Sequence, residues 1–180
     1  NAGMPVGPLA ISDEVSMSLM NHIRQQTIKD LAAEGKSIPE HPAFAVIDMM
    51  LGEYKRPGKA AGMGFYDYPA AGKKHLWPEL KARFEKADAQ IPQQDVRDRI
   101  LFIQAIETVR CVEEGVLQSV ADANVGSIFG IGFAAWTGGA LQYINQYGVK
   151  DFVARAQYLA EQYGERFLPP ALLLEKAAKD

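Results

Sequence analysis

Apolar residues recur at intervals of three and four along the first part of the chain, the spacing of one face of an α-helix. The predicted helices span residues 9–15, residue 16 or 18 to residue 35, and residues 42–52. Ser16 or Ser18 would cap the second helix, because a seryl oxygen accepts a hydrogen bond from a free backbone N–H at a helix start. We expect this helix to turn Leu19, Ile23 and Ile28 inward.

The longest helical pattern runs from Pro92 to about Gly115. Its apolar stripe comprises Val96, Ile100, Ile103, Ala105 or Ile106, Val109 or Arg110, and Val112. Its charged face comprises Asp95, Arg99, Glu107 and Glu114. Shorter helices are predicted over residues 124–129, 139–147 and 149–163, with a tail helix after Pro169-Pro170. No run of four or more residues has the period of a β-strand, so the predicted fold class is all-α.

Residues 53–76 differ from their surroundings, because glycines and prolines interrupt the apolar pattern. This composition is typical of a connector with local packing. The segment contains the aromatic cluster Phe65-Tyr66-Asp67-Tyr68, for which two roles are open. The cluster could form a binding surface, but aromatic side chains in a glycine-rich loop more often pin that loop to a core. The pinning role is favoured.

Composition and charge exclude some classes of protein. With 19 basic and 22 acidic residues and no basic run longer than Lys73-Lys74, the chain lacks the positive surface of a nucleic-acid-binding protein. No apolar stretch reaches the roughly 18 residues of a membrane-spanning helix, and we expect a soluble intracellular protein with no transmembrane segment. Cys111 is the single cysteine, and a buried structural thiol is favoured over a nucleophile.

Two segments of the chain are related to each other. Gly7 and Gly139, Leu9 and Leu141, and Asp13 and Asn145 are each 132 positions apart, which predicts an internal duplication. Strongly helical sequence precedes the later segment, whereas the earlier one begins close to residue 1. We therefore expect a first helical repeat over residues 3–76, truncated at its start, and a complete second repeat over residues 77–180.

One glycine motif resembles part of a dinucleotide-binding loop. Residues 130–135 read G-I-G-F-A-A, and Asp151 lies about twenty residues beyond them, where an acid could bind a ribose. Such a loop requires a preceding strand, and the residues before Gly130 are predicted to be helical. A corner between two helices is the favoured interpretation.

The candidate catalytic and metal-binding side chains are few. His22, His41 and His75 have no second His or Cys at the spacing of a metal site, and no carboxylate is visible that would orient any of them. Glu113 and Glu114 are adjacent on a predicted helix and point about 100° apart, so they do not converge on one substrate atom. Solvent exposure and helix-end interactions explain these two carboxylates better.

Longer segments of the chain resemble a known family. Four of them are DRILFIQAIETVRCVEEG at residues 98–115, DANVGSIFGIGF at residues 122–133, WTGG at residues 136–139 and GMPVGP at residues 3–8. The fifth runs from Lys59 to Tyr68 and ends in GFYDY, residues 64–68. Together they resemble the C-terminal part of the 3-hydroxyacyl-CoA dehydrogenases, in particular the multifunctional fatty-acid β-oxidation proteins that also carry an enoyl-CoA hydratase. The resemblance spans nearly the whole chain.

The resemblance implies a Rossmann domain that binds NAD, followed by two helical copies that imitate the dimer of the single-function enzymes. The NAD-binding glycines, the catalytic His-Glu pair and a catalytic-site Asn would all precede residue 1, so no catalytic, cofactor-binding or metal-binding residue is expected in this chain. Expected partners are an acyl-CoA substrate, other subunits and a thiolase. The expected location is the bacterial cytoplasm, or a mitochondrion or peroxisome if the source is eukaryotic.

The sequence departs from the family at three positions. Asp98-Arg99 stands where the first copy of the family has Asn-Arg, which makes a second active site doubtful. Phe129 stands where some multifunctional members have a substrate-contacting Tyr, so only apolar contact with substrate is expected from it. Ser16 replaces a glycine and could lengthen the first helix. The alternative to an enzyme part is a non-enzymatic helical scaffold or docking module.

Overall fold

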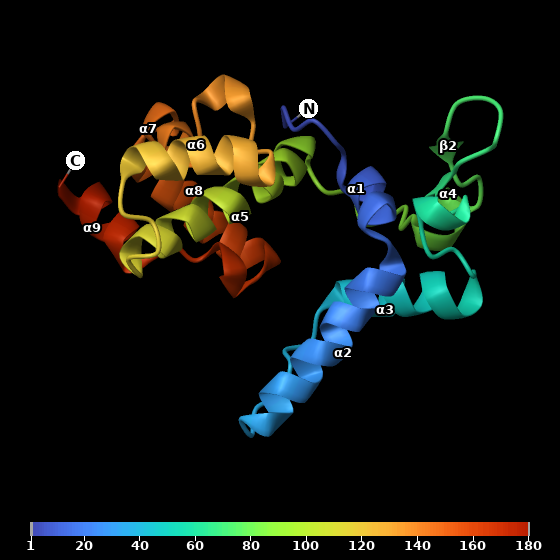
Figure 1. The fold of residues 1–180 in the computed structure, drawn as a ribbon. Coiled ribbons are helices and arrows are strands. Elements are labelled where there is room, and N and C mark those ends of the chain that lie inside the picture. The colour runs from blue at the N-terminus through green and yellow to red at the C-terminus, as the bar shows by residue number, and fades with distance from the viewer. Residues whose placement is uncertain (1, 180) are drawn as a thin grey trace. The chain divides into compact units, whose positions relative to one another are not determined.

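A computed structural model describes residues 2–179, and these residues are predominantly helical (Figure 1). The helices are α1 Pro8–Val15, α2 Met17–Ala33, α3 Pro42–Asp48, α4 Leu80–Phe84, α5 Gln93–Glu113, α6 Val120–Ile131, α7 Ala140–Tyr147, α8 Val149–Tyr163 and α9 Ala171–Lys179. The strands β1 Tyr66–Asp67 and β2 His75–Leu76 pair antiparallel, with Tyr66 opposite Leu76. The all-α fold class is confirmed, with this one short hairpin added to it.

The chain forms two compact units, each with its own core. The N-terminal unit comprises residues 6–87, and the C-terminal unit comprises residues 88–179 together with residues 2–5. Met17, Ile47, Met50, Phe65 and Trp77 form the buried core of the N-terminal unit. The structural division falls after residue 87 because Trp77 and the α4 side chains pack against this N-terminal core.

Ser16 forms a sharp joint between α1 and α2. Its backbone has φ 76° and ψ 141°, and its N–H donates to the carbonyl of Ser12, which ends α1. The expectation that Ser16 lengthens the first helix is therefore wrong, since a residue with positive φ cannot continue a right-handed helix. The predicted cap is confirmed, because Ser16 Oγ accepts from the backbone N–H of Leu19 at 3.2 Å.

Helix α2 buries far less of its surface than the apolar pattern predicts. Leu19, Ile23 and Ile28 are all exposed, so the expectation that they point inward is wrong. Met17, in the first turn, is the α2 residue that belongs to the buried core. Arg24 attaches the helix to α3 through an ion pair with Asp48, at 2.5 Å.

The third predicted helix changes geometry before its end. The α-helix stops at Asp48, and one π-helical turn, Met49–Glu53, replaces the last predicted turn. The side chain of His41 caps the start of α3, because its Nδ1 accepts from the N–H of Ala43 at 3.1 Å.

Two buried charged residues hold the glycine-rich connector in place. Asp13, on α1, accepts hydrogen bonds from the N–H groups of Phe65 and Tyr66 at 2.8 and 2.9 Å and from the Tyr68 hydroxyl at 3.0 Å. Arg56 donates to the carbonyls of the connector and lies over the Trp77 ring, 4.7 Å from its centroid. The ring of Phe65 is buried in the core, so the expected pinning of the loop is found for this residue.

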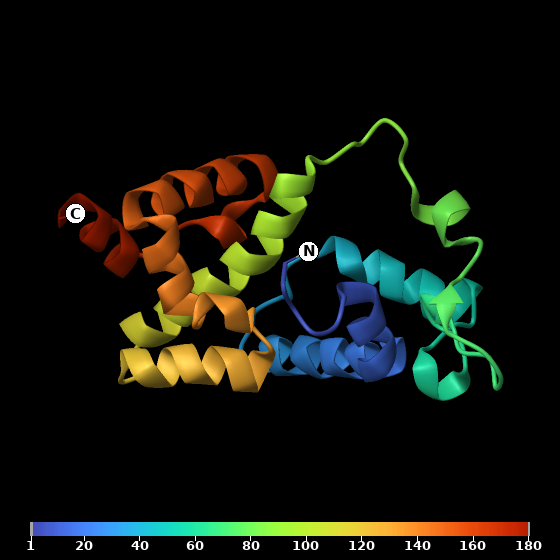
Figure 2. The ribbon, with the colours of Figure 1, turned by 90° about the horizontal axis from the view of Figure 1, so that it is seen from above.

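Helix α5 is the central element of the C-terminal unit, and Figure 2 shows α8 lying beside it. Phe102 stacks on Phe152 with ring centroids 4.0 Å apart and meets the edges of Tyr143 and Tyr147. Helix α6 is longer than predicted, because Ser119 caps it four residues earlier than expected. Ala105, Ile106 and Val109 of the predicted apolar stripe are buried in the core. The prediction is wrong at the start of the helix, where Val96 is exposed and Asp95, assigned to the charged face, is buried.

Candidate functional site

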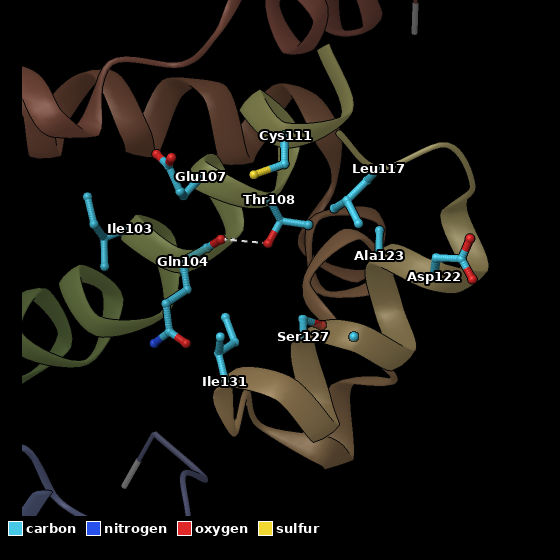
Figure 3. A pocket seen from close by; sticks show the side chains of 11 residues that line it. Ile103, Gln104, Glu107, Thr108, Cys111, Leu117, Asp122, Ala123, Ser127 and Ile131 are labelled. Atoms are coloured by element: carbon cyan, nitrogen blue, oxygen red, sulfur yellow. Dashed lines mark hydrogen bonds between the residues drawn. The ribbon is translucent and has the colours of Figure 1, made fainter. Parts of the chain in front are cut away.

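A groove of about 410 Å³ lies between α5 and α6 (Figure 3). Helix α5 contributes Ile103, Gln104, Glu107, Thr108 and Cys111, and α6 contributes Asp122, Ala123, Gly126, Ser127 and Ile131, with Leu117 from the link between them. The small residues Ala123 and Gly126 leave space on the α6 side, whereas the α5 side carries longer side chains. The lining is largely apolar, which suits an apolar chain or the face of a helix.

The side chains of Gln104, Thr108 and Ser127 in the groove already have hydrogen-bond partners within the protein. Thr108 Oγ1 donates to the carbonyl of Gln104 at 2.8 Å, and Gln104 Nε2 donates to the carbonyl of Ile100 at 3.0 Å. Ser127 Oγ donates to the carbonyl of Asn124 and accepts from the N–H of Ala140. Cys111 is free and half-buried at one end of the groove, so it is less buried than predicted. No nucleophile here contacts a general base.

Phe129, the predicted substrate-contacting residue, lies on α6 but does not line this groove. Its side chain is 85% exposed, the largest value among the exposed apolar side chains of the described residues. Val125, one turn earlier on the same helix, is also exposed, and Trp136 follows α6 with 66% exposure. Phe129 therefore belongs to an accessible apolar surface that could contact an apolar ligand or a protein.

A buried ion-pair network stands at the position where the resemblance placed a family Asn. Asp98 is fully buried, and its Oδ2 accepts from Arg155 Nε at 2.8 Å while its Oδ1 accepts from Gln94 Nε2 at 2.8 Å. Arg155 also donates to Asp95 Oδ1 at 2.5 Å. The Tyr163 hydroxyl donates to Asp95 Oδ2 at 2.6 Å. Both carboxylates thus have structural partners.

These hydrogen bonds shift the acid–base equilibria of the network. The hydroxyl of Tyr163 and then the guanidinium of Arg155 lower the pKa of Asp95, because both favour the ionised carboxylate. The bond to Asp95 raises the pKa of Tyr163. Burial opposes the charge of Arg155, but the hydrogen bonds to Asp95 and Asp98 outweigh it and raise its pKa. Asp95 and Arg155 therefore form an ion pair at neutral pH.

The glycine motif at residues 130–135 forms a corner between helices. Helix α6 ends at Ile131, and Gly132 follows with φ 68° and ψ 31°, the left-handed conformation of a C-terminal cap. A dinucleotide-binding loop would need a strand before Gly130, and here the preceding element is α6. These residues do not fit NAD, and Asp151 lies in the first turn of α8.

The remaining predicted side chains have separate partners. His75 Nε2 lies 3.5 Å from Asp67 Oδ2, a carboxylate partner that the sequence did not reveal, and the imidazole is largely exposed. Glu113 Oε1 accepts from the N–H of Leu172 at 2.8 Å and so caps the start of α9, in agreement with a helix-end role. Within residues 2–179, no three His, Cys, Asp or Glu side chains are grouped as a metal site requires. In the same residues, no helix is both long and apolar enough to cross a membrane.

Comparison with known proteins supports the family resemblance. Residues 1–68 match the family described as 3-hydroxyacyl-CoA dehydrogenase, C-terminal domain. The fatty acid oxidation complex subunit alpha of Vibrio vulnificus (strain CMCP6) is 34% identical over 180 residues, covering 98% of this chain and 24% of that protein. Residues 1–68 therefore belong to a 3-hydroxyacyl-CoA dehydrogenase C-terminal domain. The resemblance drawn from the sequence is confirmed.

Other relatives agree with this dehydrogenase domain. The subunit of the same name from Vibrio cholerae (strain ATCC 39541) is 32% identical over 176 residues, covering 97% of this chain and 24% of that protein. The chain thus spans about a quarter of the length of the curated relatives it matches. A crystal structure of 3-hydroxybutyryl-CoA dehydrogenase from Escherichia coli K12 superimposes with a TM-score of 0.64 over 99% of this chain and 52% of that one. At 17% identity, this likeness shows a shared fold.

Sequence reasoning missed two residues, one in each unit, that organise the packing of that unit. Arg155, on α8, was not singled out. Asp95 and Asp98 lie one turn apart on α5, and this pair of acids was the signal for a basic partner on another helix. Asp13 was noted only as part of a repeat, yet it is fully buried and bonds three groups of the connector. Its partners lie more than fifty residues away, so no local pattern identifies them.

Proposed function

We propose that this chain is the C-terminal helical part of an NAD-dependent enzyme that oxidises L-3-hydroxyacyl-CoA to 3-oxoacyl-CoA in fatty-acid β-oxidation. The observation that carries the proposal is the alignment of 98% of the chain with a fatty acid oxidation complex subunit alpha, together with the dehydrogenase family match. NAD supplies the hydride acceptor of this reaction. Its site and the catalytic His-Glu pair would belong to sequence outside residues 1–180, where an enoyl-CoA hydratase would also lie.

In this proposal, the chain provides a wall of the substrate cleft and a surface on which subunits pair. The exposed Phe129 ring would contact the acyl chain of the substrate, since an apolar side chain offers burial but no hydrogen bond. The fatty acid oxidation complex named in the relatives supports assembly with further subunits, of which a thiolase is our candidate. A bacterial cytoplasmic location is proposed from the bacterial relatives.

The proposal includes two copies of one helical unit, over residues 3–76 and 77–180. Helices α1 and α7 are both eight residues long, and each begins after a glycine of the repeated motif. A residue with positive φ then joins each of them to a longer helix, α2 or α8. These matches at a constant offset of 132 residues support a duplication.

The second candidate is a non-enzymatic docking module, favoured by the exposed apolar residues of α2 and α6. The two candidates differ in what the longer reading frame should encode. A G-x-G-x-x-G motif between a strand and a helix, followed by a His and a Glu, would favour the enzyme.

The cleft role of Phe129 is tested in the longer protein. Phe129→Ala should raise KM for a 3-hydroxyacyl-CoA with a long acyl chain several-fold, with a smaller effect for a four-carbon substrate. Val116→Ala, at another exposed apolar position, is the matched control. Equal kinetics for Phe129→Ala and Val116→Ala would contradict the role of Phe129.

A further inference from the structure

A second groove, of about 450 Å³, lies in the C-terminal unit among α5, α7, α8 and α9. Its walls are largely apolar and include Val109 from α5, Leu141 and Ile144 from α7, and Leu172 from α9. None of its lining residues belongs to the groove between α5 and α6. The volume falls within the range of about 300–1,000 Å³ that is typical of small-molecule sites, so this groove is a separate candidate for ligand binding.

Two polar side chains, Asn145 and Lys176, also line this groove. Asn145 follows Leu141 by one turn of α7, and Lys176 follows Leu172 by one turn of α9. Each polar residue therefore lies on the same face of its helix as an apolar residue of the wall. Neither polar side chain has a hydrogen-bond or ion-pair partner within residues 2–179, so both can bind a ligand.

The charged residues of α9 and its surroundings indicate where a negative group would lie. Lys179 forms an ion pair with Glu175, whereas Lys176 on the same helix has no carboxylate partner among the described residues. Near the start of α9, Glu113 Oε1 accepts from the N–H of Leu172 at 2.8 Å, so that end of the groove already has a negative charge. The groove thus favours a ligand with an apolar chain and a single negative charge placed at Lys176.

We infer that this groove binds a fatty acid, with its hydrocarbon chain along the apolar walls and its carboxylate at Lys176 and Asn145. The ammonium group of Lys176 would donate a charge-assisted hydrogen bond to the carboxylate, and the amide of Asn145 would donate a second one. A single hydrocarbon chain suits this groove better than a protein helix, which is about 10–12 Å across with its side chains. The inference goes beyond the proposed dehydrogenase function, because a free fatty acid is neither substrate nor product of that reaction.

The test measures binding of dodecanoate to the whole 180-residue chain by isothermal titration calorimetry, below the concentration at which micelles form. One equivalent should bind. From octanoate to decanoate to dodecanoate, the affinity should rise about threefold or more for each added methylene, because each methylene is removed from water. Dodecanol, which has the same chain without the charge, should bind about fivefold more weakly than dodecanoate.

A pair of lysine variants tests the placement of the carboxylate. Lys176→Met removes the charge but keeps a long side chain, and it should weaken dodecanoate binding about fivefold while leaving dodecanol binding unchanged. Lys179→Met is the matched control, since it removes the same charge from the same helix at a lysine that is already paired. It should leave the binding of both ligands unchanged. Circular dichroism spectra confirm that both variants are folded.

A photoreactive analogue of dodecanoate, with a diazirine in its chain, locates the ligand on the protein. After irradiation, mass spectrometry should find the crosslinked residues on α7 or α9. Crosslinks confined to α6 would place the acid in the groove between α5 and α6 or on the exposed surface around Phe129, and would overturn the inference.

Other outcomes would also overturn it. These are the absence of dodecanoate binding, an affinity that does not depend on chain length, equal binding of dodecanoate and dodecanol, or equal losses for Lys176→Met and Lys179→Met. Dodecanoyl-CoA and phosphatidylglycerol vesicles offer similar chains on phosphate-containing head groups. If either displaced dodecanoate at a lower concentration than dodecanoate itself, in a manner that depends on Lys176, the groove would belong to such a lipid and not to a fatty acid. No measurement here uses turnover of 3-hydroxyacyl-CoA or NAD, so failure is separate from failure of the dehydrogenase proposal.

Discussion

Ser16 and Gly148 form the same joint between two helices, 132 residues apart, with backbone angles of 76° and 141° for Ser16 and 89° and 124° for Gly148. Glycine adopts positive φ without strain, whereas a residue with a Cβ pays a steric cost of order 1–3 kcal/mol there. Ser16 offsets part of this cost by capping α2 through its hydroxyl. The two units therefore share the backbone conformation of this joint, although the residue at the joint differs.

Two substitutions of Ser16 should change the stability of the N-terminal unit in opposite directions. Ser16→Gly should stabilise the N-terminal unit by about 1 kcal/mol, because relief of strain exceeds the added chain entropy and the small loss of capping. Ser16→Ala should destabilise it by about 1 kcal/mol, since the strain remains and the cap is lost. Urea unfolding followed by Trp77 fluorescence measures both. A destabilised Ser16→Gly variant would show that the joint is not strained.

Asp13 should be the residue on which the connector depends most. Asp13→Ala removes the acceptor of two backbone N–H groups and one hydroxyl and should lower the free energy of unfolding of the N-terminal unit by about 3 kcal/mol or more. Its neighbour Glu14, which is exposed and paired with Lys59, provides the control Glu14→Ala, with an expected change below about 1 kcal/mol. Similar losses for both variants would contradict the proposed anchoring.

Arg155 should be essential to the packing of α8 on α5. Arg155→Met keeps most of the side-chain volume but leaves Asp98 buried and without its guanidinium, which should cost about 3 kcal/mol of unfolding free energy. Lys150→Ala, at an exposed position of the same helix, is the matched control. Chemical denaturation with Trp136 as the probe of the C-terminal unit measures the difference, and a stable Arg155→Met variant would contradict the structural role.

The Asp95 carboxylate should make the C-terminal unit sensitive to acid. The pKa of Asp95 is lowered in the folded protein. At pH values between that pKa and the ordinary aspartate pKa of about 3.9, the unfolded chain therefore binds more protons than the folded protein. The stabilisation is complete above this ordinary value and is lost as the pH falls through the folded pKa.

Tyr163→Phe removes the main cause of the lowered pKa of Asp95 and should make the acid dependence of stability shallower. Unfolding midpoints measured between neutral pH and pH 2 test this expectation. An identical pH profile for Tyr163→Phe and the unsubstituted protein would show that the hydroxyl does not act on Asp95.

The sequence predicted the positions of most helices because their apolar spacing and their Pro, Gly and Ser boundaries are local signals. It did not predict that Asp95 is buried, since the neutralising Arg155 is sixty residues away. It also placed Leu19 and Ile23 inside, because an apolar stripe predicts a covered face but not which segment covers it. The groove between α5 and α6 depends on how two separate helices pack, and no residue pattern specifies it.

Oxidation of L-3-hydroxyacyl-CoA by the longer protein that contains this chain tests the proposed function most directly. The account predicts NADH formation from the L isomer with NAD⁺, none from the D isomer, and none from residues 1–180 alone. Removal of residues 1–180 should abolish the activity of the longer protein. NADH formation by the isolated 180-residue chain, or unchanged turnover after its removal, would contradict the account.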